Sequence, residues 1–178
     1  MTPRVTELTA AAAADAGLVA QITDLVNAAY AAGEAGLWRP GWTRTTPREV
    51  ADLIATGGML VASAGEHIVG CAHVRRLDDT TADLGFVSAA PDRWGGGAGG
   101  ALVDAAEDLM RSAGVSAMQL ELLVPRDATH PVKERLRAWY ERLGYAVVRR
   151  APFEEVSTQA ARLATPCEFL VFRKPLAG

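Results

Sequence analysis

Five of the seventeen glycines in this chain of 178 residues lie between positions 91 and 103. That segment reads Pro-Asp-Arg-Trp-Gly-Gly-Gly-Ala-Gly-Gly-Ala-Leu-Val, follows a strand-like run at 84–90 and continues into an amphipathic stretch. A backbone without side chains can approach a phosphate closely, and the first N–H groups of a helix have no partner inside that helix. The segment therefore predicts a cradle for a ligand that carries a pyrophosphate.

Two other interpretations of the glycine segment stay open from the residues alone. The pattern Gly95-x-Gly97-x-x-Gly100, with Glu121 found 21 residues later, also fits a dinucleotide-binding turn and its ribose-binding acid. A dinucleotide domain opens with a βαβ unit, whereas three hairpin-like strands precede this segment. A P-loop is excluded because no Gly-Lys-Ser/Thr follows. A flexible solvent loop is the remaining alternative.

The elements that must position this segment are predicted from hydrophobic periodicity and turn residues. A capping box at Thr46–Glu49 begins one helix, and short polar connections after it indicate antiparallel hairpins. Strands are expected at 4–9, 59–63, 68–77, 81–90, 115–124, 145–150 and 168–173. Helices are expected at 14–32, from the capping box to Gly57, from the glycine segment to Gly114, and from the loop 125–131 to Gly144, with a short helical insertion near 154–163. The order predicts an α/β (α+β) fold, a single mixed and mostly antiparallel sheet flanked by helices, in one domain of residues 1–178.

The composition is that of a soluble globular protein, with 49% hydrophobic and 22% charged residues. A net charge of −3 argues against nucleic acid as the main partner. Residues 125–150 have seven basic and three acidic side chains, a local +4 that suits a polyanionic small ligand or an ordinary solvated helix face. No signal peptide or membrane-length apolar run is evident, and Cys71 and Cys167 match no metal-ligand spacing. We therefore expect a cytoplasmic protein with no membrane partner, no metal and two buried thiols.

Two segments together resemble the GNAT superfamily of acyl-CoA-dependent N-acetyltransferases. The family's Gln/Arg-x-x-Gly-x-Gly/Ala motif falls on Trp94–Gly99, and its Tyr-x-x-Leu-Gly-Phe/Tyr motif falls on Tyr140–Tyr145. The resemblance covers roughly residues 4–175, and the expected order of elements agrees with the family fold. Two positions depart from the pattern. Trp94 replaces the usual Gln or Arg, and Lys133 stands where the family often has an Asn that touches the pantetheine arm.

The resemblance implies acetyl-CoA as the co-substrate. Backbone amides of the glycine segment would hold the pyrophosphate, and backbone groups of Val87 and Ala89 would hold the pantetheine and polarise the thioester carbonyl. Tyr140 would protonate the departing thiolate, and Asp83 would accept the proton of the amine. A core aromatic and a polar residue at a hairpin end are the plainer interpretations of these two residues. The full set expected to bind the coenzyme is Val87, Ala89, Arg93, Trp94, Gly95, Gly96, Gly97, Ala98, Gly99 and Gly100.

The implied reaction is direct transfer of acetyl from acetyl-CoA to a primary amine in a ternary complex, because neither a cysteine nor a serine lies in a convincing nucleophile setting. The acceptor would be a small-molecule amine or a peptide. Trp38, Trp42 and Arg44 lie where the family often builds its acceptor pocket. A non-catalytic acyl-CoA-binding or interaction module is the alternative, with an NAD-dependent oxidoreductase third. By analogy with relatives, a homodimer through the late strands is also open.

Overall fold

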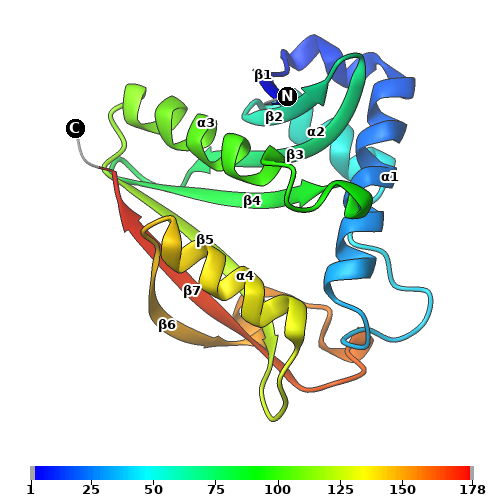
Figure 1. The fold of residues 1–178 in the computed structure, drawn as a ribbon, viewed down its shortest axis with the longest axis vertical. Coiled ribbons are helices and arrows are strands. Elements are labelled where there is room, and N and C mark those ends of the chain that lie inside the picture. The colour runs from blue at the N-terminus through cyan, green and yellow to red at the C-terminus, as the bar shows by residue number, and fades with distance from the viewer. Residues whose placement is uncertain (1–2, 177–178) are drawn as a thin grey trace.

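The computed structural model of the chain describes residues 3–176. Seven strands form one sheet in the order β1-β2-β3-β4-β5-β7-β6, shown in Figure 1. Their bounds are β1 (Arg4–Glu7), β2 (Met59–Ala64), β3 (His67–Arg76), β4 (Thr81–Ala89), β5 (Ala117–Pro125), β6 (Ala146–Pro152) and β7 (Cys167–Pro175). All neighbouring strands pair antiparallel except β4 and β5, which are parallel. The predicted mixed and mostly antiparallel sheet is confirmed.

The helices begin and end at residues that the sequence marks. They are α1 (Ala16–Gly33), α2 (Pro47–Thr56), α3 (Ala98–Ser112), α4 (Pro131–Arg142) and the short α5 (Phe153–Val156), with 3-10 turns at Ala10–Ala14, Pro91–Arg93 and Ala160–Arg162. The Thr46 hydroxyl accepts a hydrogen bond from the Glu49 N–H at 3.2 Å, which confirms the predicted cap of α2. The helix expected at 14–32 begins later, at Ala16, because the Asp15 carboxylate accepts from the N–H groups of Gly17 and Leu18.

The helices cover both faces of the sheet. The larger apolar cluster packs α3 and α4 on one face, with Leu102, Met118 and Phe172 fully buried in it. On the other face α1 and α2 bury a second cluster against β2, β3 and β4, centred on Ile22, Ile54 and Met59. Burying both faces excludes solvent from the middle of the sheet, while the end of α1 and the start of α4 lie near the place where the sheet opens (Figure 1).

The sheet opens between β4 and β5. These strands pair only from Thr81 to Asp83, opposite Ala117–Gln119, and then diverge, as Figure 1 shows. A bulge in β4 adds to the bend, because Cys71 lies opposite Ser88 while His73 lies opposite Gly85. Phe86, inside that bulge, has a φ of 56°, the left-handed region that side chains other than glycine rarely adopt. The chain therefore stores backbone strain at the point where the two strands part.

The structure also decides three further points from the sequence: the dinucleotide interpretation, the state of the two cysteines and the helical insertion. The hairpins β2–β3–β4 before the glycine segment exclude the doubly wound parallel sheet that the dinucleotide interpretation requires. Cys71 and Cys167 are free and buried, as expected. The insertion expected near 154–163 consists of α5 and the last 3-10 turn. Within residues 3–176, no helix is both long enough and apolar enough to cross a membrane.

Candidate active site

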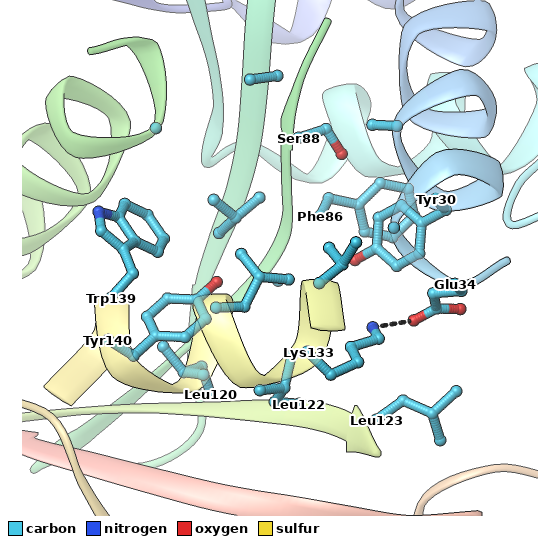
Figure 2. Close-up of a pocket in the computed structure, with 18 of the residues that line it drawn as sticks. Tyr30, Glu34, Phe86, Ser88, Leu120, Leu122, Leu123, Lys133, Trp139 and Tyr140 are labelled. Carbon is cyan, nitrogen blue, oxygen red and sulfur yellow. Dashed lines mark hydrogen bonds and ion pairs between the residues drawn. The ribbon is translucent and has the colours of Figure 1, made fainter. Parts of the chain in front are cut away.

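A cavity of about 920 Å³ occupies the opening between β4 and β5. Its walls come from α1, β4, the glycine segment, β5 and α4, with part of the segment between β6 and β7 closing one side. Figure 2 shows the aromatic side chains of Trp139 and Tyr140 on one side and Tyr30 and Phe86 on the other. A volume near the upper end of the usual range for ligand pockets suits an extended ligand together with a second molecule.

The glycine segment, which the sequence predicts to bind a pyrophosphate, forms one end of this cavity. Gly95 and Gly97 have φ values of 85° and 84°, which only glycine adopts without strain. The first hydrogen bond of α3 runs from the Ala101 N–H to the Gly97 carbonyl at 3.0 Å, and no side chain caps the helix. The N–H groups of residues 98–100 therefore have no partner within the helix and lie in the cavity wall, an arrangement that binds anions.

The predicted coenzyme residues lie together, with one exception. Val87, Ala89, Arg93, Trp94, Gly95, Gly97, Ala98, Gly99 and Gly100 line the cavity, whereas Gly96 does not. A Cβ on Gly96 would lie 2.9 Å from the Arg93 carbonyl oxygen, so this glycine permits the turn itself. The Trp94 indole donates to the Ala89 carbonyl at 3.0 Å. The tryptophan that replaces the family's usual residue thus joins the glycine segment to the end of β4.

Replacing Gly97 with alanine is expected to shift the backbone N–H groups of residues 98–100. If one charge-assisted hydrogen bond to the phosphates of the implied acetyl-CoA is weakened by about 1.4 kcal/mol, acetyl-CoA binding falls about tenfold. The left-handed backbone of Gly97 also costs an alanine about 1–2 kcal/mol of stability. Gly41 is a matched control, since it has the same φ of 84° and open space around it but lies outside the cavity. Calorimetric titration and urea unfolding of both variants check this. Equal coenzyme affinity in the two variants would show that Gly97 has no part in the cradle.

Tyr140 is placed by α4 so that its hydroxyl faces the cavity. Its ring packs against Trp139, Tyr145 and Phe172, and only 7% of the residue is exposed. Burial, with a smaller contribution from Tyr30, raises the pKa of Tyr140 above that of a free phenol, so the group stays protonated. Among residues 3–176 its hydroxyl has no hydrogen-bond partner, whereas the Tyr145 hydroxyl donates to Glu107 at 2.9 Å. A protonated phenol with a free hydroxyl can serve a ligand in the cavity.

Asp83 lies at the closed end of the opening and does not line the cavity. Its carboxylate is 3.5 Å from the Arg75 Nε, and its Oδ1 atom is buried without a partner in the described part of the chain. Glu121 lies two residues beyond Gln119, the last residue of β5 that pairs with β4, and it does line the cavity. Glu121 is an exposed residue whose carboxyl group is partly desolvated, and this desolvation and, to a smaller degree, the charge of Asp83 raise its pKa.

Glu121 is the acid that sequence reasoning assigned only to the dinucleotide interpretation. The alternation of polar and apolar residues in 115–124 places it on the same face as Gln119, and its carboxylate accepts from the Gln119 amide at 3.3 Å. No sequence signal marks the residue at which β4 and β5 stop pairing. The structure shows that this pairing ends at Asp83, so Asp83 lies in the paired part of the strands and Glu121 in the open part.

The three residues expected at an acceptor pocket all line the cavity. The rings of Trp38 and Trp42 stack with their centres 3.9 Å apart, and the Trp42 indole donates to Gln159 at 2.7 Å. The Arg44 guanidinium lies over the ring of Phe86, 4.2 Å from its centre. The nearby His130 contacts the Ala35 carbonyl at 3.0 Å and lies outside the cavity.

A buried ion pair joins α1 to α4 across the cavity wall. The Lys133 ammonium lies 2.7 Å from Glu34 Oε1, and the two side chains are 4% and 5% exposed (Figure 2). The second Glu34 oxygen accepts from the Trp38 indole at 2.5 Å. Sequence reasoning did not find Glu34, because its partner is 99 residues away. Lys133 stands where the family often has Asn, and the Glu34 carboxylate neutralises its charge.

A sequence model of the GNAT acetyltransferase family matches residues 21–145, a span that includes most of α1, the glycine segment and Tyr140. The chain belongs to the GNAT acetyltransferase family. Its resemblance to this family, inferred above from two motifs, is therefore confirmed. A search of curated proteins finds no match.

Solved structures share the GNAT fold at low sequence identity. An aminoglycoside 6'-N-acetyltransferase complexed with coenzyme A is 16% identical with a TM-score of 0.72, and 98% of each chain is covered. PaiA N-acetyltransferase from Thermoplasma acidophilum, also with coenzyme A, is 15% identical with a TM-score of 0.70, covering 98% of this chain and 99% of that one. The ribosomal-protein-S18-alanine N-acetyltransferase from Escherichia coli is 14% identical with a TM-score of 0.69, covering 99% and 96%.

Within residues 3–176 of this GNAT protein, no group of three or more His, Cys, Asp or Glu side chains is placed so that it could hold a metal ion. Several polar groups without partners in the described part of the chain do line the cavity. They are the N–H groups that begin α3, the Tyr140 hydroxyl and the buried Ser88 Oγ on β4. Such a row of unsatisfied groups fits an extended ligand with phosphates at one end and amide groups further along, which is the chemistry of coenzyme A.

Proposed function

We propose that this protein transfers an acetyl group from acetyl-CoA to a primary amine, directly, in a ternary complex. The observation that carries the proposal is the presence in one cavity of a free helix N-terminus and an unpartnered, protonated Tyr140. A binding module needs the first of these groups and has no use for the second. The two GNAT structures solved with coenzyme A support the choice of co-substrate.

The coenzyme would be held mainly by backbone groups. The N–H groups of residues 98–100 would bind the pyrophosphate, and the β4 backbone at Val87 and Ala89 would hold the pantetheine and polarise the thioester carbonyl. Arg135 and Arg142 line the cavity on the same side of α4 as Trp139, whose ring lies beside Gly99. Their charges would meet the remaining phosphate, which agrees with the local positive charge found in the sequence.

The reaction needs two proton movements. The amine nitrogen attacks the thioester carbonyl carbon, so that a C–N bond forms, the C–S bond breaks and the thiolate leaves. Tyr140 would give its proton to that thiolate, and the apolar walls that raise the phenol pKa raise the thiol pKa as well, which limits the mismatch. A lysine-like amine at pH 7 spends about 4.6 kcal/mol to become neutral, so a base in the cavity matters.

We assign the acceptance of the amine proton to Glu121. Asp83 had been expected in this role, but Glu121 lines the cavity and Asp83 does not. Asp83 is then a positioning residue, because its charge raises the pKa of Glu121 and makes it a better proton acceptor near neutral pH. Asp83 lies opposite Gln119 where β4 and β5 stop pairing, and Glu121 lies two residues further along β5, so the two carboxylates interact at the point where the sheet opens.

A pH profile tests the assignment of Glu121. Protonated Glu121 cannot accept a proton, so kcat should fall as pH drops through a pKa above that of an ordinary carboxyl group. Glu121→Gln should remove this acid limb and lower kcat about tenfold at neutral pH, where water must take the proton. Asp83→Asn should move the limb to lower pH, since one cause of the raised pKa is gone. An unchanged limb in Glu121→Gln would assign the base elsewhere.

The function as a whole is tested by calorimetry and thiol release. Acetyl-CoA should bind with micromolar affinity while NAD gives no response, and a panel of small amines and short peptides should include acceptors that release free coenzyme A. Tight acetyl-CoA binding with no thiol release from any amine would favour the non-catalytic coenzyme-binding module. Absence of acetyl-CoA binding would overturn both and leave an interaction module.

A further inference from the structure

We propose that the acceptor is a small zwitterion, an amino acid with an aromatic or large apolar side chain, whose carboxylate binds Arg44. This inference rests on the proposed acetyl transfer and names the substrate class that the same cavity takes. It follows from the charges left over in the part of the cavity away from the glycine segment.

The charge balance of that part is simple. Glu34 and Lys133 neutralise each other within their buried pair, and Arg135 and Arg142 lie with Trp139 on the coenzyme side. The remaining charged groups among the described cavity residues outside the glycine segment are Arg44 and Glu121. An acceptor that brings both a cationic amine and an anion complements them, whereas a simple polyamine would meet the repulsion of Arg44.

Arg44 is held in place by its surroundings. Its guanidinium carbon lies 4.2 Å from the centre of the Phe86 ring and 5.2 Å from that of Tyr30. The next residue, Thr45, is fixed by Asn27 of α1, whose amide exchanges two hydrogen bonds with the Thr45 backbone at 3.0 and 3.1 Å. An arginine that binds an anion through two parallel N–H groups needs a fixed plane, and these contacts supply one.

The Arg44 fork is only partly paired inside the protein, by Glu49 and the Tyr30 phenol. Its contact with Glu49 Oε1 is 3.9 Å, well beyond a charged hydrogen bond, and the other Glu49 oxygen accepts from the Thr45 hydroxyl at 2.8 Å. Arg44 also acts on the Tyr30 phenol through its charge and a side-chain hydrogen bond, and both offset part of the rise that burial causes in the pKa of Tyr30. With 28% of its side chain exposed, the guanidinium keeps donors for an external anion. The planar guanidinium fork can bind the two oxygens of a carboxylate through two parallel hydrogen bonds.

The position of Arg44 limits the length of the acceptor. Phe86, on which the guanidinium lies, directly precedes Val87, where the proposed thioester is held. Because Arg44 and Val87 line the same cavity and the residue under the guanidinium is the chain neighbour of Val87, the carboxylate site lies next to the thioester site, which favours a short acceptor. The stacked rings of Trp38 and Trp42 form an apolar wall of the same cavity, which favours a flat or bulky apolar side chain. These three constraints together describe an amino acid.

The test compares each amino acid with its own amide. Phenylalanine, tyrosine, tryptophan, leucine and methionine are assayed beside their carboxamides, which lack the carboxylate and have less basic amines. The amides hold more neutral amine near pH 8, so intrinsic reactivity favours them. We expect the opposite order, with kcat/KM for the best amino acid at least about tenfold above that of its amide, the effect of one charged hydrogen-bonded pair.

Arg44→Gln should lower kcat/KM for that amino acid about 10- to 100-fold and change that for its amide by less than about threefold. Arg48→Gln is the matched control, because Arg48 is exposed on α2 and lies outside the cavity. Acetyl-CoA titration of each variant reports whether its fold is intact. Should Arg44→Gln fail to fold, the comparison of acid and amide in the wild-type protein still decides the inference.

Binding separates this inference from the proposed reaction. Titration of the same acids and amides into the protein saturated with coenzyme A measures recognition without turnover. Tighter binding of the acids supports the carboxylate site even where no acetyl transfer occurs, and transfer would then be the part that fails. Acetylation of the amides at rates equal to or above those of the acids overturns the carboxylate site and leaves the acetyltransferase proposal in place.

Discussion

Replacing Tyr140 with phenylalanine is expected to lower kcat about 100-fold and to leave the acetyl-CoA affinity within about twofold. The variant removes only the hydroxyl, which has no partner in the described part of the protein, and keeps the ring contacts with Trp139, Tyr145 and Phe172. Without the phenol, the thiolate leaves unprotonated or must find a proton in water. An assay of thiol release measures kcat, and calorimetric titration measures the acetyl-CoA affinity.

Tyr145→Phe is a matched control within the same motif. Its hydroxyl donates to the buried Glu107 at 2.9 Å, and Lys174 contacts that carboxylate at 2.7 Å. Losing this neutral-to-charged hydrogen bond should cost about 1.5–3 kcal/mol of stability and change kcat little. The two tyrosines are five positions apart in one motif, and their variants are expected to show opposite effects on turnover and stability. A Tyr140→Phe variant with full turnover would remove the general-acid assignment and favour Tyr140 as a core aromatic.

The sequence predicts well those features that depend on neighbouring residues. The glycine segment lies between β4 and α3, as predicted, and the capping box at Thr46 begins α2. Hairpins with short connections give β2, β3 and β4 in the right order. In each case the determining interaction spans only a few residues, so its pattern can be found in the chain itself.

Features that depend on distant residues were harder to predict. The strands β4 and β5 separate after Asp83 because β5 continues with β7 and β4 bends at the Phe86 bulge, and neither cause is written in the segment 81–90. For the same reason Asp83 was favoured over Glu121, which lines the cavity from the next strand. Glu34 also escaped notice, since a glutamate at the end of a predicted helix is ordinarily solvated, and only α4 reveals its partner.

Lys133→Met is expected to lower the free energy of unfolding by about 3–5 kcal/mol, because it leaves the Glu34 carboxylate buried without its cation. The Trp38 indole, 2.5 Å from Glu34 Oε2, cannot replace a charge. Urea unfolding at neutral pH measures the loss. Arg137→Met on the same helix is the control, since the Arg137–Glu141 pair is largely exposed and its loss should cost less than about 1 kcal/mol.

The double variant Glu34→Gln with Lys133→Met should recover most of this loss, because an uncharged amide keeps an oxygen for Trp38 and needs no cation. Recovery would establish that the pair acts as a unit that ties α1 to α4 beside the cavity. A stable Lys133→Met protein with weakened acetyl-CoA binding would contradict this and assign Lys133 the pantetheine contact that Asn makes elsewhere in the family. The unusual lysine would then serve the coenzyme directly, and Glu34 would serve to orient it.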